Sequence, residues 1–169
     1  MQIVWKALMS LEEYAALGKT IPFPVPGECP ACRRKVNLKR HGWYLRYAAR
    51  EDLEVQVWIP RLLCPACGRT ISLLPSFLIP RFQRTVGFIV KVLGRKLSCS
   101  RQVLEFYWHR FLTNINRILA FFRDLFAGLP LPKDPKLKAM KLREMVEDFP
   151  AEEFSVLFHQ RFGRSFMAI

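Results

Sequence analysis

The chain has 169 residues, a length typical of one domain or of two small ones and too short for a large multidomain enzyme. Its hydrophobic content of 51% indicates a folded protein rather than a disordered one. The 27 Lys and Arg residues outnumber the 14 Asp and Glu residues, which gives a formal net charge of +13. Such a charge favours a polyanionic partner, although a solvated basic surface without a partner is the alternative.

The positive charge is concentrated in residues 1–129, which hold 20 basic and 8 acidic side chains, whereas residues 130–169 hold 7 and 6. The sequence shows no secretory signal and no apolar run long enough to span a membrane. We therefore expect a cytoplasmic, nucleoid-associated protein that makes no membrane contact. Five cysteines in such a chain favour a reducing compartment, where paired thiols bind metal more often than they form disulfides.

Residues 1–26 are expected to form an N-terminal helix followed by a Pro-rich linker. Apolar residues recur at helical spacing over residues 1–18, and Ser10 followed by Glu13 is a capping signal. Three prolines at alternate positions in residues 21–27 are incompatible with a helix, so this segment is expected to be extended.

Residues 27–80 are expected to form a small zinc ribbon that contains an antiparallel β-hairpin. Apolar and polar side chains alternate over residues 43–47 and again over residues 55–59, and the two runs are joined through residues 50–52. A third short strand is expected over residues 70–74.

Two copies of a Cys-Pro-Ala-Cys motif flank this hairpin. Two residues between cysteines let both sulfurs of a pair face one ion, and two such pairs complete a tetrahedral set of ligands. Gly68 gives the second motif the permissive backbone that such a turn needs. A redox pair, two disulfides and chance are the competing interpretations, but a redox pair would lie between a strand and a helix. One structural zinc ion is therefore expected, in a closed site that leaves no position for water or substrate, with the ligands Cys29, Cys32, Cys64 and Cys67.

Residues 81–129 are expected to form a helical domain of the helix-turn-helix kind. A first helical stripe precedes Ser100, which offers an N-cap for a second helix over residues 101–108. Thr113 is predicted to cap a third helix, which ends near Gly128. Three short helices joined by tight breaks are typical of a helix-turn-helix unit.

Residues 130–169 are expected to form a helical C-terminal tail with helices over residues 136–147 and 151–162. The tail is rich in phenylalanine, which could face a protein partner or a second copy of the chain, or could complete the core. These residues are Phe149, Phe154, Phe158, Phe162 and Phe166. Strands followed by helices make the predicted fold class α+β.

The segments around the two cysteine motifs form a wider pattern, which includes residues 41–46, 61–70 and 74–80. Over roughly residues 27–125 this pattern resembles the N-terminal region of bacterial transposase-like proteins, in which a zinc ribbon precedes a helix-turn-helix. The resemblance implies a DNA-binding module of mobile-element origin. Bulky aromatic residues over 106–111 depart from the family pattern, and the residues after it are too few for a nuclease domain.

Two surfaces are predicted to contact nucleic acid. On the ribbon, basic residues interleaved with aromatic ones could grip phosphates or stack on unpaired bases, so single-stranded DNA or RNA competes with duplex DNA. The third helix carries Asn and Arg side chains that could read base edges in the major groove. The predicted contact residues are Arg33, Arg34, Lys35, Lys39, Arg40, Arg46, Arg110, Thr113, Asn114, Asn116, Arg117 and Arg123.

No enzymatic activity is expected, because the acidic residues are scattered and no nucleophile lies beside a base. The sequence therefore predicts a nucleic-acid-binding protein, with duplex DNA the favoured partner, that is related to transposases or is a domesticated accessory factor without a catalytic domain. The alternative is a zinc-ribbon adaptor that binds a protein partner, or single-stranded DNA or RNA, within a larger nucleoprotein complex.

Overall fold

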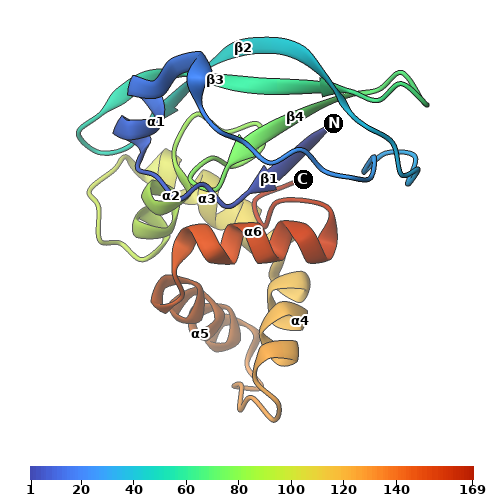
Figure 1. Cartoon of the computed structure of the whole chain (residues 1–169). Coiled ribbons are helices and arrows are strands. Elements are labelled where there is room, and N and C mark those ends of the chain that lie inside the picture. The colour runs from blue at the N-terminus through green and yellow to red at the C-terminus, as the bar shows by residue number, and fades with distance from the viewer. The chain divides into compact units, whose positions relative to one another are not determined.

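Four β-strands, six α-helices and one short 3₁₀ helix form along the chain, and the computed structural model describes residues 1–169 (Figure 1). The predicted α+β class is confirmed. The chain divides into two compact units, Met1–Thr85 and Val86–Ile169. A helix needs about 20 apolar residues to cross a bilayer, and none of these helices has the required length and apolarity.

The first unit is built on a four-stranded sheet with the strand order β1-β4-β3-β2 (Figure 1). Its strands are β1 (Gln2–Trp5), β2 (Lys39–Ala49), β3 (Glu54–Leu63) and β4 (Thr70–Pro75). β2 and β3 form the predicted antiparallel hairpin, and β4 is antiparallel to β3. β1 pairs in parallel with the free edge of β4.

The N-terminal segment differs from the helix predicted over residues 1–18. The helix α1 spans only Leu11–Leu17, is followed by a 3₁₀ turn over Gly18–Thr20, and is preceded by β1. The β-branched and aromatic side chains of β1 favour a strand, and β4 offers an edge for it to pair with. The predicted capping signal is confirmed, because the Ser10 hydroxyl accepts from the Glu13 N–H (3.2 Å) and the Glu13 carboxylate accepts from the Ser10 N–H (2.7 Å).

β2 carries one charged side chain that is tied to the interior. The Arg46 guanidinium donates hydrogen bonds to the backbone oxygens of Ile79, at 2.6 Å, and of Phe82. Burial lowers the pKa of Arg46, but an arginine still remains protonated at physiological pH. Leu45 and Tyr47, the neighbours on the opposite face, are each 46% exposed. Arg46 therefore holds β2 to the segment after β4, and its role as a nucleic-acid contact stays a prediction.

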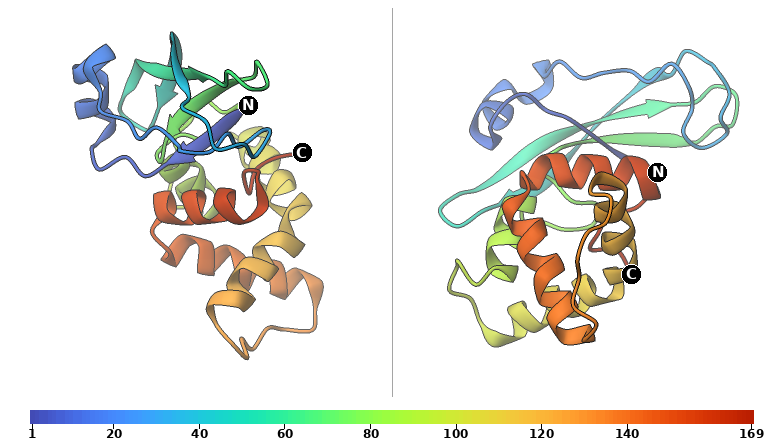
Figure 2. Two further views of the ribbon diagram at one scale, coloured as in Figure 1. Left: turned by 45° about the vertical axis from the view of Figure 1, so that its right-hand side comes forward. Right: turned by 90° about the horizontal axis from the view of Figure 1, so that it is seen from below.

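The second unit consists of helices only. They are α2 (Val86–Leu93), α3 (Arg101–Thr113), α4 (Ile115–Leu125), α5 (Pro135–Asp148) and α6 (Ala151–Phe162). Figure 2 shows α5 and α6 lying against the earlier helices of this unit. Asp134 caps α5 by accepting a hydrogen bond from the Leu137 N–H (2.8 Å), and Pro135 occupies the first turn.

The core of the second unit is a cluster of phenylalanine rings. Phe121 on α4 lies 5.1 Å from Phe154 on α6, measured between ring centroids, and Phe154 lies 5.0 Å from Phe166. Phe154, Phe158 and Phe166 are fully buried. These residues of the segment 130–169 therefore complete the core, and they are not an exposed surface for a partner.

Only Asn114 separates α3 from α4. The helix predicted over residues 101–108 continues to Thr113, so Thr113 ends α3 instead of capping the next helix. Asn114 forms no side-chain cap either. A helix-turn-helix turn has about three to four residues, so this junction is shorter than that class requires. The helix-turn-helix assignment stays a prediction.

The phenylalanine cluster predicts where the second unit is most sensitive to truncation. Phe154→Ala should lower the free energy of unfolding by about 3–5 kcal/mol, because it opens a cavity among packed rings. Phe126→Ala, at a position 47% exposed, should lower it by less than about 1 kcal/mol. Urea denaturation followed by circular dichroism measures both, and equal effects of the two substitutions would contradict this description of the core.

Candidate metal centre and basic surface

The four cysteines of the two motifs converge on one point. All four sulfurs lie within 4.8 Å of one another. The Sγ atoms of Cys29 and Cys67 are 3.9 Å apart, and those of Cys32 and Cys64 are 3.8 Å apart. A disulfide bond has a length of about 2.05 Å, so these are free thiols rather than two disulfides. The arrangement is compatible with a metal site.

Each motif forms the same backbone turn. In the first turn, residues 29–34, the Cys29 N–H donates to the carbonyl of Arg34 (2.9 Å) and the Arg33 N–H donates to the carbonyl of Cys29 (2.8 Å). In the second turn, residues 64–69, the equivalent bonds from Cys64 and Gly68 measure 3.0 and 2.9 Å. The two turns are therefore copies in structure as well as in sequence.

The hairpin brings the two turns together. Lys39 at the start of β2 pairs with Leu63 at the end of β3, so the residues before and after the hairpin emerge side by side. A small apolar cluster supports the cysteines, and it includes Leu38 and Leu62 beside the buried Cys29 and Cys64. The long spacer between the motifs thus adds little closure cost, because a regular hairpin fills it.

The thiols of the cluster differ in acidity. Burial opposes ionisation of Cys29, but backbone hydrogen bonds within the first turn and the neighbouring thiols outweigh it and lower the pKa of Cys29 to about 6. At Cys67 a backbone hydrogen bond from Arg69 favours the thiolate, but desolvation and the other three thiols raise the pKa of Cys67 to about 11. The Cys29 thiolate therefore forms readily, whereas the Cys67 thiol resists ionisation. A bound cation would have to displace protons.

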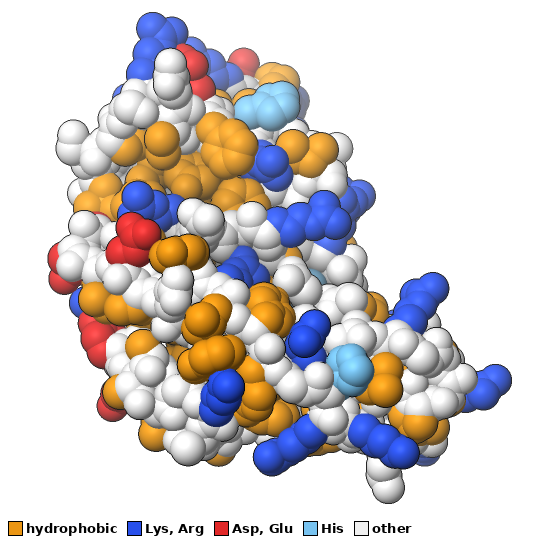
Figure 3. Space-filling view, turned by 90° about the horizontal axis from the view of Figure 1, so that it is seen from above, with side chains coloured by type: hydrophobic (Ala, Val, Ile, Leu, Met, Phe, Trp, Pro, Cys, Tyr) orange, Lys and Arg blue, Asp and Glu red, His pale blue; other side chains and the backbone are white.

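The first cysteine turn leads into a basic segment. Residues 29–42 contain five basic side chains and no acidic one. All five are exposed, and only one of them has a nearby carboxylate, since Arg33 lies 3.6 Å from Glu28. Arg69 is exposed at the matching place of the second turn and was not predicted, although the repeat of the motif could have indicated it. In Figure 3 Lys and Arg side chains are spread over the face shown, and fewer acidic side chains are visible there. The five predicted contacts here are Arg33, Arg34, Lys35, Lys39 and Arg40.

The aromatic side chains of the hairpin have partners within the first unit. Trp43 packs edge-on against Phe23, with ring centroids 5.5 Å apart, and the Arg40 guanidinium lies 5.2 Å from the same Phe23 ring. The Arg61 guanidinium lies 5.9 Å from the Tyr44 ring. Trp43 and Tyr44 thus have ring contacts within the first unit, whereas Tyr47 is exposed.

The predicted contacts in the second unit divide into exposed and internal residues. Thr113, Asn116 and Arg123 are exposed, and Arg117 is half-buried. Asn114 is only 1% exposed, and its amide donates to the carbonyls of Arg110 (3.0 Å) and Ala168 (2.6 Å). The prediction that Asn114 contacts nucleic acid is therefore wrong.

The Arg110 side chain also makes contacts within the second unit. Its guanidinium donates to the carbonyl of Met167 (3.1 Å) and lies 4.6 Å from the Phe106 ring centroid. These contacts tie part of the guanidinium to its own unit, and the role of Arg110 as a phosphate contact stays a prediction.

Residues 29–106 match a protein family described as a domain of unknown function (DUF6431). The match begins at the first cysteine of the cluster and includes all four. No curated protein and no solved structure matches the chain.

The two cysteine turns predict opposite effects for substitutions at their equivalent positions. Both turns need a positive φ, which is 60° at Arg33 and 69° at Gly68. Gly68→Ala should lower stability by about 1–2 kcal/mol, because a side chain is strained there, although there is open space around it. Arg33→Gly should raise stability by up to about 1 kcal/mol.

Thermal unfolding of the two variants beside the unchanged protein measures these effects. A gain from Gly68→Ala, or a loss above about 1 kcal/mol from Arg33→Gly, would contradict the equivalence of the two turns.

Proposed function

We propose that the four cysteines bind one structural zinc ion and that the first unit is a zinc ribbon. Zinc binds thiolates at about 2.3 Å in a tetrahedron, whose edges are then about 3.8 Å long. The two measured sulfur pairs, at 3.8 and 3.9 Å, have this spacing. Four protein ligands leave no open position on the ion, so the proposed role is to hold the hairpin and the two turns together.

The zinc proposal predicts one zinc ion per chain in elemental analysis. Cys64→Ala should lose the metal and unfold the first unit, because zinc binding supplies about 10–16 kcal/mol in small zinc domains. Cys99→Ala, at the cysteine outside the cluster, should retain it. Zinc should dissociate as the pH falls, because protons compete for the thiolates. A metal-free protein whose sheet persists, as measured by circular dichroism, would contradict the proposal.

We propose further that the protein binds nucleic acid through the basic segment of the first unit. The single observation that supports this is the run of five exposed basic side chains within residues 29–42, with no acidic residue among them. Exposed Lys and Arg side chains neutralise phosphates and release counterions, which supplies most of the affinity for a nucleic-acid backbone. A metal-held turn would keep these side chains in fixed positions.

Duplex DNA is the partner that the aromatic contacts favour. Proteins that bind single strands stack bases on exposed aromatic rings. Trp43 and Tyr44 instead have neighbours within the unit, Phe23 and Arg61, which leaves Tyr47 as the exposed ring of β2. The basic segment is thus left to contact phosphates, which a duplex presents at regular spacing.

The role that we propose is that of a transposase-related or domesticated accessory factor. The resemblance of the cysteine motifs and their surroundings to transposase-like proteins supports this role. On α4, the exposed Asn116 could contact a base edge and Arg123 a phosphate.

The nucleic-acid proposal is tested by the salt dependence of duplex binding. Arg34→Ala/Lys35→Ala should weaken binding to all duplex sequences and reduce the slope of log K against log salt by about 2, because each phosphate contact contributes about 0.9. Lys6→Ala/Lys133→Ala removes the same charge from exposed sites outside the basic segment and should leave the slope nearly unchanged. Fluorescence anisotropy at several salt concentrations measures both.

Equal slopes for the two double variants would show that the basic segment does not contact the backbone. Tighter binding to single-stranded than to duplex DNA of the same length would overturn the choice of duplex.

A further inference from the structure

The second unit contains a pocket of about 630 Å³. It lies between the segment that joins α2 to α3, the helix α3 and the helix α5. Its volume falls within the range of about 300–1,000 Å³ that is typical of small-molecule sites. None of its residues belongs to the cysteine cluster or to the predicted nucleic-acid contacts.

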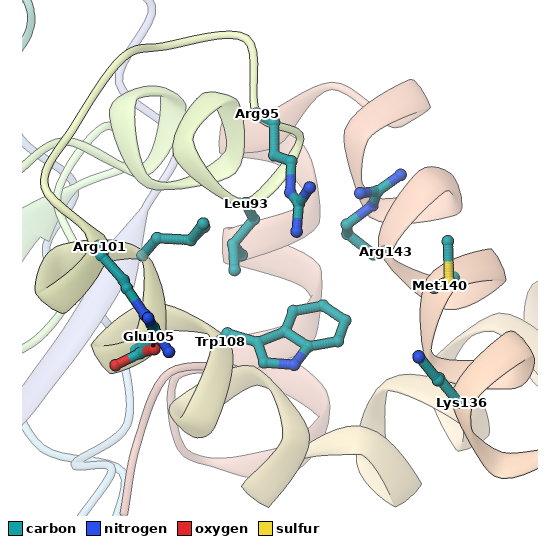
Figure 4. Close-up of a pocket in the computed structure, with 9 residues that line it drawn as sticks. Leu93, Arg95, Arg101, Glu105, Trp108, Lys136, Met140 and Arg143 are labelled. Carbon is teal, nitrogen blue, oxygen red and sulfur yellow. Dashed lines mark hydrogen bonds and ion pairs between the residues drawn. The ribbon is translucent and has the colours of Figure 1, made fainter.

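An indole ring occupies the centre of this pocket. Figure 4 shows the Trp108 ring at the middle, with Arg95, Lys136 and Arg143 placed around it. Trp108 also stacks on Phe111, with ring centroids 5.4 Å apart and planes 14° from parallel. This contact fixes the orientation of the indole, so the pocket offers a preformed aromatic surface.

The pocket has more positive charge than its own carboxylates neutralise. Of its four basic residues, Arg101 is paired with Glu105, with 2.6 Å between Nε and Oε1. Arg95 and Lys136 are exposed and form no ion pair. Three cations thus surround the indole, and the pocket has no other acidic residue.

Arg143 has an unsatisfied donor. Its side chain is only 19% exposed, and its closest carboxylate, that of Glu144, lies 3.7 Å away. The Arg143 Nε atom is buried and has no hydrogen-bond partner. The guanidinium lines the pocket, and its contact with Glu144 is longer than a hydrogen bond, so its terminal N–H groups can bind an anionic group.

From these observations we propose that the pocket binds a nucleoside phosphate, with its planar base against Trp108 and its phosphate among Arg95, Lys136 and Arg143. A phosphate monoester carries a charge of about −1.5 to −2 at neutral pH, which matches several cations better than one carboxylate does. Arginine forms paired hydrogen bonds with phosphate oxygens. The base gains by stacking on the indole, as bases do on exposed aromatic side chains.

The backbone at Arg95 makes the proposal testable without loss of the fold. The Lys96 N–H donates to the carbonyl of Lys91 (2.9 Å) and the Arg95 N–H donates to the carbonyl of Val92 (3.0 Å), which is the pattern of a helix end closed by a left-handed residue. Arg95 is that residue, with φ 57°, and glycine is favoured there. Arg95→Gly therefore removes the cation and relieves backbone strain at once.

The experiment measures binding to the full, metal-loaded chain by isothermal titration calorimetry. The probes are adenosine monophosphate, adenosine, inorganic phosphate and a 5′-phosphorylated pentathymidylate. We expect adenosine monophosphate to bind at least about tenfold more tightly than adenosine or inorganic phosphate, because only it offers both groups. Binding of the phosphorylated oligonucleotide alone would identify a strand end as the source of the nucleotide, and binding of the free nucleotide would identify a soluble ligand.

Charge variants locate the site. Arg95→Gly and Lys136→Glu should each weaken binding of the preferred probe about tenfold or more, while Arg95→Gly leaves the melting temperature unchanged or raised. Lys133→Glu changes the same charge at an exposed position outside the pocket and should bind as the unchanged protein does.

Absence of binding by every probe, inorganic phosphate bound as tightly as the nucleotide, or unchanged binding by both pocket variants would overturn the proposal. Duplex binding should have the same salt slope in the Arg95→Gly variant as in the unchanged protein. The pocket proposal and the nucleic-acid proposal can therefore fail independently.

Discussion

The first unit depends on the convergence of four sulfurs at one end of a hairpin. The register of β2 with β3 brings the two turns together, and their four sulfurs lie within 4.8 Å of one another. Most of the neighbouring apolar residues come from short stretches of chain around these turns.

The second unit reaches stability by a different means. Its helices are short, and its interior is filled by large rings that meet at centroid distances of about 5–6 Å. Aromatic side chains bury a large area each, so a few of them suffice for a small helical core. The near-neutral charge of residues 130–169 agrees with this role, because these residues contribute packing rather than a cationic surface.

The sequence was informative where a pattern repeats. The two Cys-Pro-Ala-Cys motifs indicated the cluster, and the alternation on both sides of residues 50–52 indicated the hairpin. It misled at the N-terminus, because a run of four residues is too short to show a period and pairs with a strand almost seventy residues away. The one-residue junction at Asn114 was missed because the pattern indicated Thr113 as the N-cap, whereas Asn114 bonds to Ala168, which only the fold brings near.

Composition also does not distinguish exposed basic side chains from those that bond to the backbone of their own unit. Arg46 and Arg110 have the same side chain as Arg34, yet the first two donate to backbone carbonyls within their own units. The pocket around Trp108 was not foreseen at all, because its residues come from three segments that only the folded helices bring together. Long-range placement of this kind has no signature in a single sequence.

The junction between α3 and α4 is bonded to the C-terminal residues of the chain. Asn114 and Arg110 both donate to carbonyls near the C-terminus, those of Ala168 and Met167. The last residues of the chain therefore hold this junction through two hydrogen bonds. Displacement of these residues would break both bonds together. The junction of α3 and α4 is therefore held by a segment more than fifty residues further along the chain.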